Sequence, residues 1–156
     1  MKTELILVGR TQSRLMEEGM TDYARRVAHY MPFNVEVIPE LKNTRAMSHD
    51  EQKQREGELI LRRIGTADHV VLFDEHGRQY RSVDFARWLQ KKQAAGQKLV
   101  LVVGGPYGFS EAVRKRADEA VSLSPMTFSH QMVRLIIAEQ LYRACTIIKG
   151  EPYHHE

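Results

Sequence analysis

Three short segments carry residue types that suit a ligand site. Phe73-Asp74 closes one apolar run, Gly104-Gly105-Pro106-Tyr107-Gly108 follows a second, and Ser124-Pro125-Met126-Thr127-Phe128 follows a third that ends at Leu123. The glycines of the middle segment allow a ligand to approach the backbone closely and leave free amides before a helix. The mixed apolar and hydroxyl side chains of the last segment suit an uncharged aromatic or thioether ligand better than a triphosphate. Each segment alone is also compatible with a plain connection, because the glycines match neither the Walker pattern nor G-x-G-x-x-G.

Further candidate side chains surround the last apolar stretch of the chain. Arg134 and Arg143 interrupt this stretch, and each is suited either to a phosphate or to an ion pair with Glu139. His130 precedes the stretch and His154 follows it, and both histidines are candidate bases. His130 is equally suited to capping a helix. The single cysteine and the absence of Cys/His metal spacing predict no metal site.

Alternating apolar runs and amphipathic stretches predict the elements that position these residues. We expect strands at 5–8, 33–37, 70–73, 99–103 and 120–123, and helices at 13–30, 50–64, 83–93, from Ser110 onward and at 131–149. A polar loop is expected at 43–48 and a turn at Gly77. Residues 99–103 are apolar on both faces, as in a central parallel strand. The predicted fold class is α/β, a mostly parallel sheet flanked by helices, which binds ligands at the carboxyl ends of its strands.

The helix expected at 131–149 is apolar over far more than a single stripe. Its apolar residues from 133 onward are Val133, Leu135, Ile136, Ile137, Ala138, Leu141, Tyr142, Ala144, Cys145, Ile147 and Ile148. Such a helix needs cover on two sides. The sheet supplies one side, and a second copy of the chain is the obvious supplier of the other, which predicts a homodimer. An unusually buried core helix is the alternative.

The composition is that of an ordinary globular chain. Its 156 residues, 42% hydrophobic and 28% charged, predict a single domain spanning 1–156 and exclude disordered and collagen-like classes. Neither a membrane span nor a secretory signal is found, so we expect a cytoplasmic protein without a membrane partner. The net charge of +3 permits a nucleic-acid partner without requiring one. The basic residues available for phosphate contact are Arg10, Arg14, Arg25, Arg26, Arg114, Lys115 and Arg116.

Four motifs dominate the last third of the chain. They are Gly104-Gly105-Pro106-x-Gly108, Ser122-Leu123-Ser124-x-Met126-Thr127-Phe128-x-His130-Gln131-x-x-Arg134, Glu139-Gln140-x-Tyr142-Arg143-Ala144 and Gly150-x-Pro152-Tyr153-His154. Together they resemble the ribosomal large-subunit methyltransferase H family of the SPOUT superfamily. The resemblance covers the whole chain and is most specific in this third. The family methylates N3 of a pseudouridine in the helix 69 loop of 23S rRNA, within the 70S ribosome or its large subunit.

The resemblance implies S-adenosylmethionine as cofactor, a trefoil knot near the C-terminus and a homodimer built around the last helix. It assigns cofactor contact to Phe73, Gly104, Gly105, Leu123, Ser124, Pro125, Met126, Thr127 and Phe128. It makes His154, Arg134 and Tyr142 the candidate catalytic group, with His130 as a second candidate base and Tyr153 as a further positioning residue. The family commonly has proline where Ser129 stands here, and we expect this serine to cap the following helix. A Gly105→Arg substitution is expected to fill the cofactor crevice.

Two other functions remain open at this point. A flavodoxin-like module would bind a flavin or nucleotide at the same strand ends. Against it, Gly9-Arg10-Thr11 stands where a Ser/Thr-rich phosphate loop would follow the first strand. A ribosome-associated factor without catalytic activity is the other alternative, which a failure to bind S-adenosylmethionine would favour.

Overall fold

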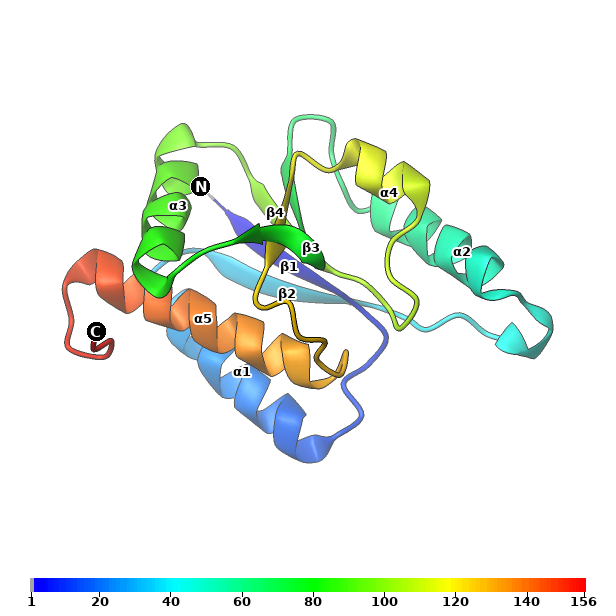
Figure 1. Ribbon diagram of the computed structural model, residues 1–156, viewed down its shortest axis with the longest axis horizontal. Helices are drawn as coiled ribbons and strands as arrows, with labels where there is room; N and C mark the ends of the chain where they lie inside the picture. The colour runs from blue at the N-terminus through cyan, green and yellow to red at the C-terminus, as the bar shows by residue number, and fades with distance from the viewer. Residues whose placement is uncertain (1) are drawn as a thin grey trace.

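Helices cover both faces of a five-stranded parallel sheet in the computed structural model, which describes residues 2–156 (Figure 1). The strands are β1 (Thr3–Val8), β2 (Phe33–Ile38), β3 (His69–Gln79), β4 (Leu99–Val103) and β5 (Glu119–Ser122). The helices are α1 (Arg14–Ala28), α2 (His49–Leu61), α3 (Ser82–Ala95), α4 (Glu111–Arg116) and α5 (Met132–Lys149). A short 3-10 helix, η1 (Thr44–Ala46), lies in the segment expected to be loop. The predicted α/β class and parallel sheet are confirmed.

The strands lie in the order β2-β1-β4-β3-β5, and every pairing between them is parallel. The central strand β4 is buried along its whole length, as its apolar sequence predicts. A flavodoxin-like sheet has the order 2-1-3-4-5. Because β3 and β4 have exchanged places here, the flavodoxin-like alternative is wrong.

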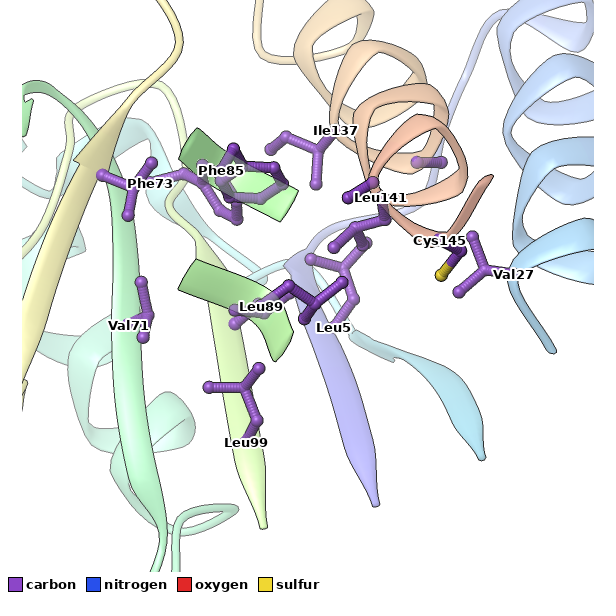
Figure 2. Packing of buried hydrophobic residues seen from close by; sticks show 14 of the residues in the cluster. Leu5, Val27, Val71, Phe73, Phe85, Leu89, Leu99, Ile137, Leu141 and Cys145 are labelled. Atoms are coloured by element: carbon purple, nitrogen blue, oxygen red, sulfur yellow. The ribbon is translucent and has the colours of Figure 1, made fainter. Parts of the chain in front are cut away.

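Alternating side chains of the strands build two cores, one on each face of the sheet. Leu5 and Leu7 of β1 point toward the layer of α1, α3 and α5, while Ile6 and Val8 point toward α2 and α4. Figure 2 shows the first core, in which Phe73 of β3 lies near Phe85 of α3. Each large side chain removed from water stabilises the fold by about 1.5–3 kcal/mol. The carboxyl ends of the strands are thereby held rigidly at one edge.

Serine side chains fix the starts of several helices. Ser13, Ser48 and Ser110 each accept a hydrogen bond from the backbone N–H three residues further on. Ser129 Oγ accepts hydrogen bonds from the N–H groups of Gln131 and Met132, both at 3.2 Å. The N-cap position of α5 is Gln131, so the expected capping by Ser129 is not found; the Ser129 hydroxyl instead holds the turn that leads into the helix.

The predicted end of the third strand is wrong. β3 continues past Asp74 to Gln79, and its pairing with β5 shifts register so that Phe73 and Arg78 both lie opposite Val121. Residues 74–77 between them form a bulge rather than the end of the strand. The sequence of residues 74–77 is polar, like that of a turn, because these residues lie outside both cores. Gly77 stands where a Cβ would lie 2.6 Å from the Ala120 backbone, so only glycine passes β5 this closely.

Helix α5 lies against α1 and α3 (Figure 1). Seven of its residues are buried, including Ile137, Leu141 and Ala144, while much of its remaining apolar surface is half-buried. A single chain thus covers α5 only in part. Among residues 2–156, no helix is both long and apolar enough to cross a membrane.

Candidate functional site

The three segments identified in the sequence line one cavity of about 560 Å³ at the carboxyl edge of the sheet. The volume lies in the usual range for small-molecule sites. Of the residues expected at the cofactor, the cavity is lined by Phe73, Gly104, Gly105, Leu123, Ser124, Met126, Thr127 and Phe128. Pro125 is exposed and lies outside this lining. The structure therefore brings all but one of the expected cofactor residues together.

The glycine segment forms a tight turn along one wall of the cavity. The Gly108 N–H donates to the Gly105 carbonyl at 3.1 Å, and Gly108 has a φ of +82°, which favours glycine. A Cβ at Gly104 would lie 3.1 Å from the Phe109 ring. The absence of side chains therefore keeps this wall close to its neighbours and leaves its backbone accessible from the cavity.

Gly105 has a neighbour that the sequence did not reveal. A Cβ at this position would lie 2.6 Å from Oε1 of Glu56 in α2. This oxygen is buried and has no hydrogen-bond partner among the described residues. Burial, with a smaller effect from Glu40, raises the pKa of Glu56. A side chain at Gly105 would meet the Glu56 carboxyl group as well as the cavity, so the expected filling of the crevice by Gly105→Arg stays a prediction.

Hydroxyl groups hold the segment 123–128 in place. Ser122 donates to the Ser124 carbonyl at 2.9 Å, and Ser124 Oγ accepts from the Met126 N–H at 3.0 Å. Thr127 donates to Oε2 of Glu75 at 2.8 Å, which connects this segment to the β3 bulge. These hydroxyls are occupied within the protein, so the apolar side chains and backbone remain to contact a ligand.

The β3 bulge adds a charged rim to the cavity. Its lining includes Asp74, Glu75 and His76, together with Arg114 of α4. Glu75 and His76 were missed by the sequence analysis because the strand was expected to end before them. Polar residues directly after the buried strand could have indicated this rim, but the same residue types are equally typical of a turn.

Of the two candidate bases that the sequence analysis named, His130 lines the cavity and His154 does not. Arg134, one turn further along, is 1% exposed and points away from solvent. Its guanidinium donates to the carbonyls of Val8 at 2.6 Å and Gly9 at 2.8 Å, and to the Thr11 hydroxyl at 3.1 Å. Burial lowers the pKa of Arg134, and Glu40 partly offsets this effect. Arg134 thus joins α5 to the end of β1.

Tyr142 and His154 do not line the cavity. Tyr142 is ten residues beyond Met132 at the start of α5, a rise of about 15 Å along the helix, and His154 lies beside the neighbouring Arg143. Tyr142 packs against the rings of Tyr23, Tyr30 and Tyr153, with centroid separations of 5.9, 6.1 and 4.7 Å. A single chain therefore does not bring Tyr142 or His154 to the cavity.

Polar contacts order the tail around Arg143. This side chain donates to Nδ1 of His154 at 3.0 Å and to Oε1 of Glu139 at 2.7 Å. The Tyr153 hydroxyl donates to the same Glu139 oxygen at 3.0 Å. Burial and hydrogen bonds with Tyr23 and Glu139 raise the pKa of Tyr153 well above its ordinary value. The expected pairing of Arg143 with Glu139 is confirmed.

The basic residues suggested for phosphate contact divide into engaged and available groups. Arg116 donates to the carbonyls of Gly65 and Asp68, and Arg14 pairs with Glu18. Within residues 2–156, Arg10 and Arg25 have no carboxylate within 4.0 Å. No three His, Cys, Asp or Glu side chains in that range form a potential metal site.

Comparison with known proteins shows the family of the chain. A family model described as "Predicted SPOUT methyltransferase" matches residues 1–154. The chain belongs to the SPOUT methyltransferase family. Curated relatives match it over their full length. They include proteins named Ribosomal RNA large subunit methyltransferase H from Bacteroides fragilis, 54% identical, and Parabacteroides distasonis, 52% identical, each with 100% of both chains covered. The resemblance drawn from the C-terminal motifs is confirmed.

Solved structures give a more distant likeness. The SpoU methyltransferase AviRb from Streptomyces viridochromogenes aligns with a TM-score of 0.48 at 19% identity, covering 96% of this chain and 61% of that one. A likeness at this level carries no further conclusion, and the family assignment rests on the sequence matches.

Proposed function

We propose that this chain transfers a methyl group from S-adenosylmethionine to N3 of a pseudouridine in the helix 69 loop of 23S rRNA, on the assembled ribosome. The observation that carries the proposal is the full-length identity of more than half with relatives named Ribosomal RNA large subunit methyltransferase H. The convergence of the expected cofactor residues on one cavity supports it independently. A cytoplasmic location and a single domain over 1–156 accompany the proposal.

The cavity fits the cofactor by shape and chemistry. Phe73, Val103, Val121 and Leu123 provide an apolar floor suited to an adenine ring, and the side-chain-free backbone of Gly104 lets a ligand approach. Bound S-adenosylmethionine would supply a methyl group on a positively charged sulfur. The protein's task is to align the acceptor nitrogen with that group, a contribution of roughly 7–11 kcal/mol to lowering the barrier.

The proton on N3 of the acceptor must be transferred to a base when the nitrogen is methylated. We propose that His130 accepts it, because this histidine lines the cavity and the Ser129 hydroxyl holds the turn in which it lies. Arg134 acts as a positioning residue, since its hydrogen bonds to the end of β1 set where α5 begins. Tyr142 and His154 belong to the same reaction only if a second copy presents its tail to the cavity.

A homodimer formed along α5 and α1 meets that condition. Two copies of α5 packed antiparallel would place the tail of each, which lies beside Arg143, near the cavity of the other at the start of α5. The α1 and α5 surface is suited to such contact because Leu15 is 79% exposed and Met132 is also exposed. A hydrogen bond from the Gln12 N–H to the Gln131 side chain, at 2.7 Å, holds the two helix starts together. We propose the trefoil knot near the C-terminus as part of the same fold.

Methyl transfer to ribosomes tests this function directly. Purified protein is incubated with isotopically labelled S-adenosylmethionine and ribosomes that lack the modification, and the rRNA is digested for nucleoside mass spectrometry. We expect label in 3-methylpseudouridine from helix 69, with free 23S rRNA labelled far less. Label in another nucleoside would reject the proposed acceptor, and folded protein that binds the cofactor but transfers nothing would indicate a non-catalytic factor. His130→Ala is expected to bind cofactor normally and transfer slowly, by roughly 100-fold.

A further inference from the structure

The charged rim of the cavity is not explained by binding an adenosine group. Adenosine is uncharged at neutral pH, and the apolar floor already suits it. The rim instead brings the guanidinium of Arg114 beside the carboxylate of Asp74, and Glu75 lines the same cavity. Opposite charges at one side of a small-molecule cavity suit a ligand that itself carries both charges.

Arg114 is held so that part of its guanidinium remains available. Its Nη1 donates to Oδ2 of Asp74 at 2.5 Å, and its Cζ lies 5.8 Å from the centre of the Phe109 ring. Within residues 2–156 this is the only hydrogen bond found for the Arg114 side chain, out of five N–H donors that a guanidinium has. The remaining donors are free for a ligand in the cavity.

Asp74 is an ionised acceptor in a sheltered position. Its side chain is 11% exposed. Burial alone would raise the pKa of Asp74, but hydrogen bonds from Arg114 and the His76 N–H, with the charge of Arg114, outweigh burial and lower it. The second oxygen, Oδ1, accepts only the long 3.4 Å bond from the His76 N–H. Asp74 therefore retains capacity to accept a hydrogen bond from a ligand cation.

The neighbours of Arg114 have other roles. Arg116 is bound to two backbone carbonyls and to Asp118, and Lys115 faces Glu111 on the outside of α4. Of this run of three basic residues, Arg114 alone lines the cavity. The run is therefore not a uniform phosphate-binding surface, and Arg114 belongs to the cavity.

We propose that Arg114 and Asp74 bind the amino-acid end of the cofactor, Arg114 through its carboxylate and Asp74 through its ammonium group. The inference rests on the proposed function. A planar guanidinium with free donors matches a carboxylate, and a sheltered carboxylate matches an ammonium ion. The apolar floor takes the adenosine, and the pair of charges selects ligands that carry an α-amino acid over nucleosides that do not.

Two ligands isolate this contact. S-adenosylhomocysteine and 5′-methylthioadenosine share the adenosine and an uncharged sulfur, but only the first has the amino-acid end. Each is titrated calorimetrically into the full chain and into Arg114→Ala, Asp74→Asn and Arg87→Ala. Arg87 is the matched control, because it forms an exposed pair with Asp84 on α3 and does not line the cavity.

We expect wild-type protein to bind S-adenosylhomocysteine at least about tenfold more tightly than 5′-methylthioadenosine. Arg114→Ala and Asp74→Asn should each lower the affinity for S-adenosylhomocysteine by about tenfold. Each should lower the affinity for 5′-methylthioadenosine by less than about twofold. Arg87→Ala should change neither. A merely structural ion pair would instead weaken both ligands equally or neither, and either result overturns the inference.

The failure of this inference differs from failure of the proposed function. If the wild-type protein binds neither S-adenosylhomocysteine nor 5′-methylthioadenosine, both the proposed function and this inference are overturned. If the wild-type protein binds them and the folded variants discriminate between the two ligands as well as it does, only the role of Arg114 and Asp74 is overturned. Thermal unfolding of each variant establishes that it is folded. If Arg114→Ala does not fold, Arg114→Lys replaces it, with the same selective weakening expected. Equal affinity of the wild-type protein for the two ligands overturns the inference without any variant.

Discussion

At the residue scale, Arg134 shows how one buried side chain positions a site without lining it. Its guanidinium satisfies two carbonyls at the end of β1 and a hydroxyl of the following loop. Removing it leaves these acceptors buried and unpaired, which is costly in a protein interior. The sequence offered phosphate contact, catalysis or an ion pair for this arginine, and none of these describes the observed contacts with the backbone.

Replacing Arg134 by methionine should therefore destabilise the fold. We expect the free energy of unfolding to fall by about 3 kcal/mol, since several charge-assisted hydrogen bonds are lost together. Urea titration followed by circular dichroism measures this change. Arg10→Met, at an exposed position without an ion pair, is the control and should change stability by less than about 0.5 kcal/mol. An effect of Arg134→Met as small as that of the control contradicts the anchoring role.

Glu119, at the edge of the sheet away from the cavity, predicts how stability depends on acid. Burial alone would raise its pKa, but hydrogen bonds from Lys92, Trp88 and His69 outweigh burial and lower the pKa from 4.5 to about 2. A carboxyl with a lowered folded-state pKa stabilises the fold above pH 4.5 and loses that contribution between pH 4.5 and about 2. Glu119→Gln should lose less stability than wild type across this interval, as measured by unfolding at each pH. Parallel pH curves for the two proteins would disprove this.

At the element scale, the bulged strand β3 is the feature that the sequence predicted least well. The order of helices and strands follows from apolar periodicity, and the glycine segment and residues 123–128 were placed correctly at one edge. The bulge could not be predicted, because polar residues such as those at 74–77 are typical both of a turn and of an exposed strand segment. Its existence depends on long-range pairing with β5, which leaves no local signal. The charged rim was missed for the same reason.

The bulge itself is testable through Gly77. A methyl group there would press on the Ala120 backbone, 2.6 Å away, so Gly77→Ala should cost about 2 kcal/mol by overpacking and weaken cofactor binding. Chemical unfolding and calorimetry measure the two effects. Gly96→Ala provides the comparison, because Gly96 has a φ of +80° but open space around it, and should cost about 1 kcal/mol without affecting the cavity. If the two variants behave alike, close packing of β3 on β5 is not what Gly77 provides.

At the scale of the whole molecule, the separation of cavity and tail is the main constraint. The sequence motifs place His130, Tyr142 and His154 in one stretch of the chain, but Tyr142 is about 15 Å along α5 from Met132, and His154 lies beside Arg143. Residues that are close in sequence are therefore separated along the helix, and the proposed second copy would bring them together. The broad apolar surface of α5 predicted cover beyond the sheet, and α1 and α3 supply part of it within the chain.

The proposed dimer is tested by a charge on its apolar surface. Leu15→Glu with Met132→Glu should convert the dimer to a monomer, as sedimentation velocity measures, because both side chains are exposed at the starts of α1 and α5. Each cavity is complete within one chain, so cofactor binding should persist while methyl transfer is lost. Val37→Glu, at another exposed apolar residue, should remain dimeric and active. A wild-type monomer, or a fully active monomeric variant, contradicts the dimer proposal.

The most direct test of the account is calorimetric titration of the purified full chain with S-adenosylmethionine. We predict saturable binding at one site per chain, abolished by Gly104→Phe, whose side chain starts beside Phe109 in the cavity wall. Circular dichroism of the variant confirms that it is folded. Absence of binding by folded wild-type protein, or undiminished binding by a folded Gly104→Phe variant, would contradict the assignment of this cavity to the cofactor.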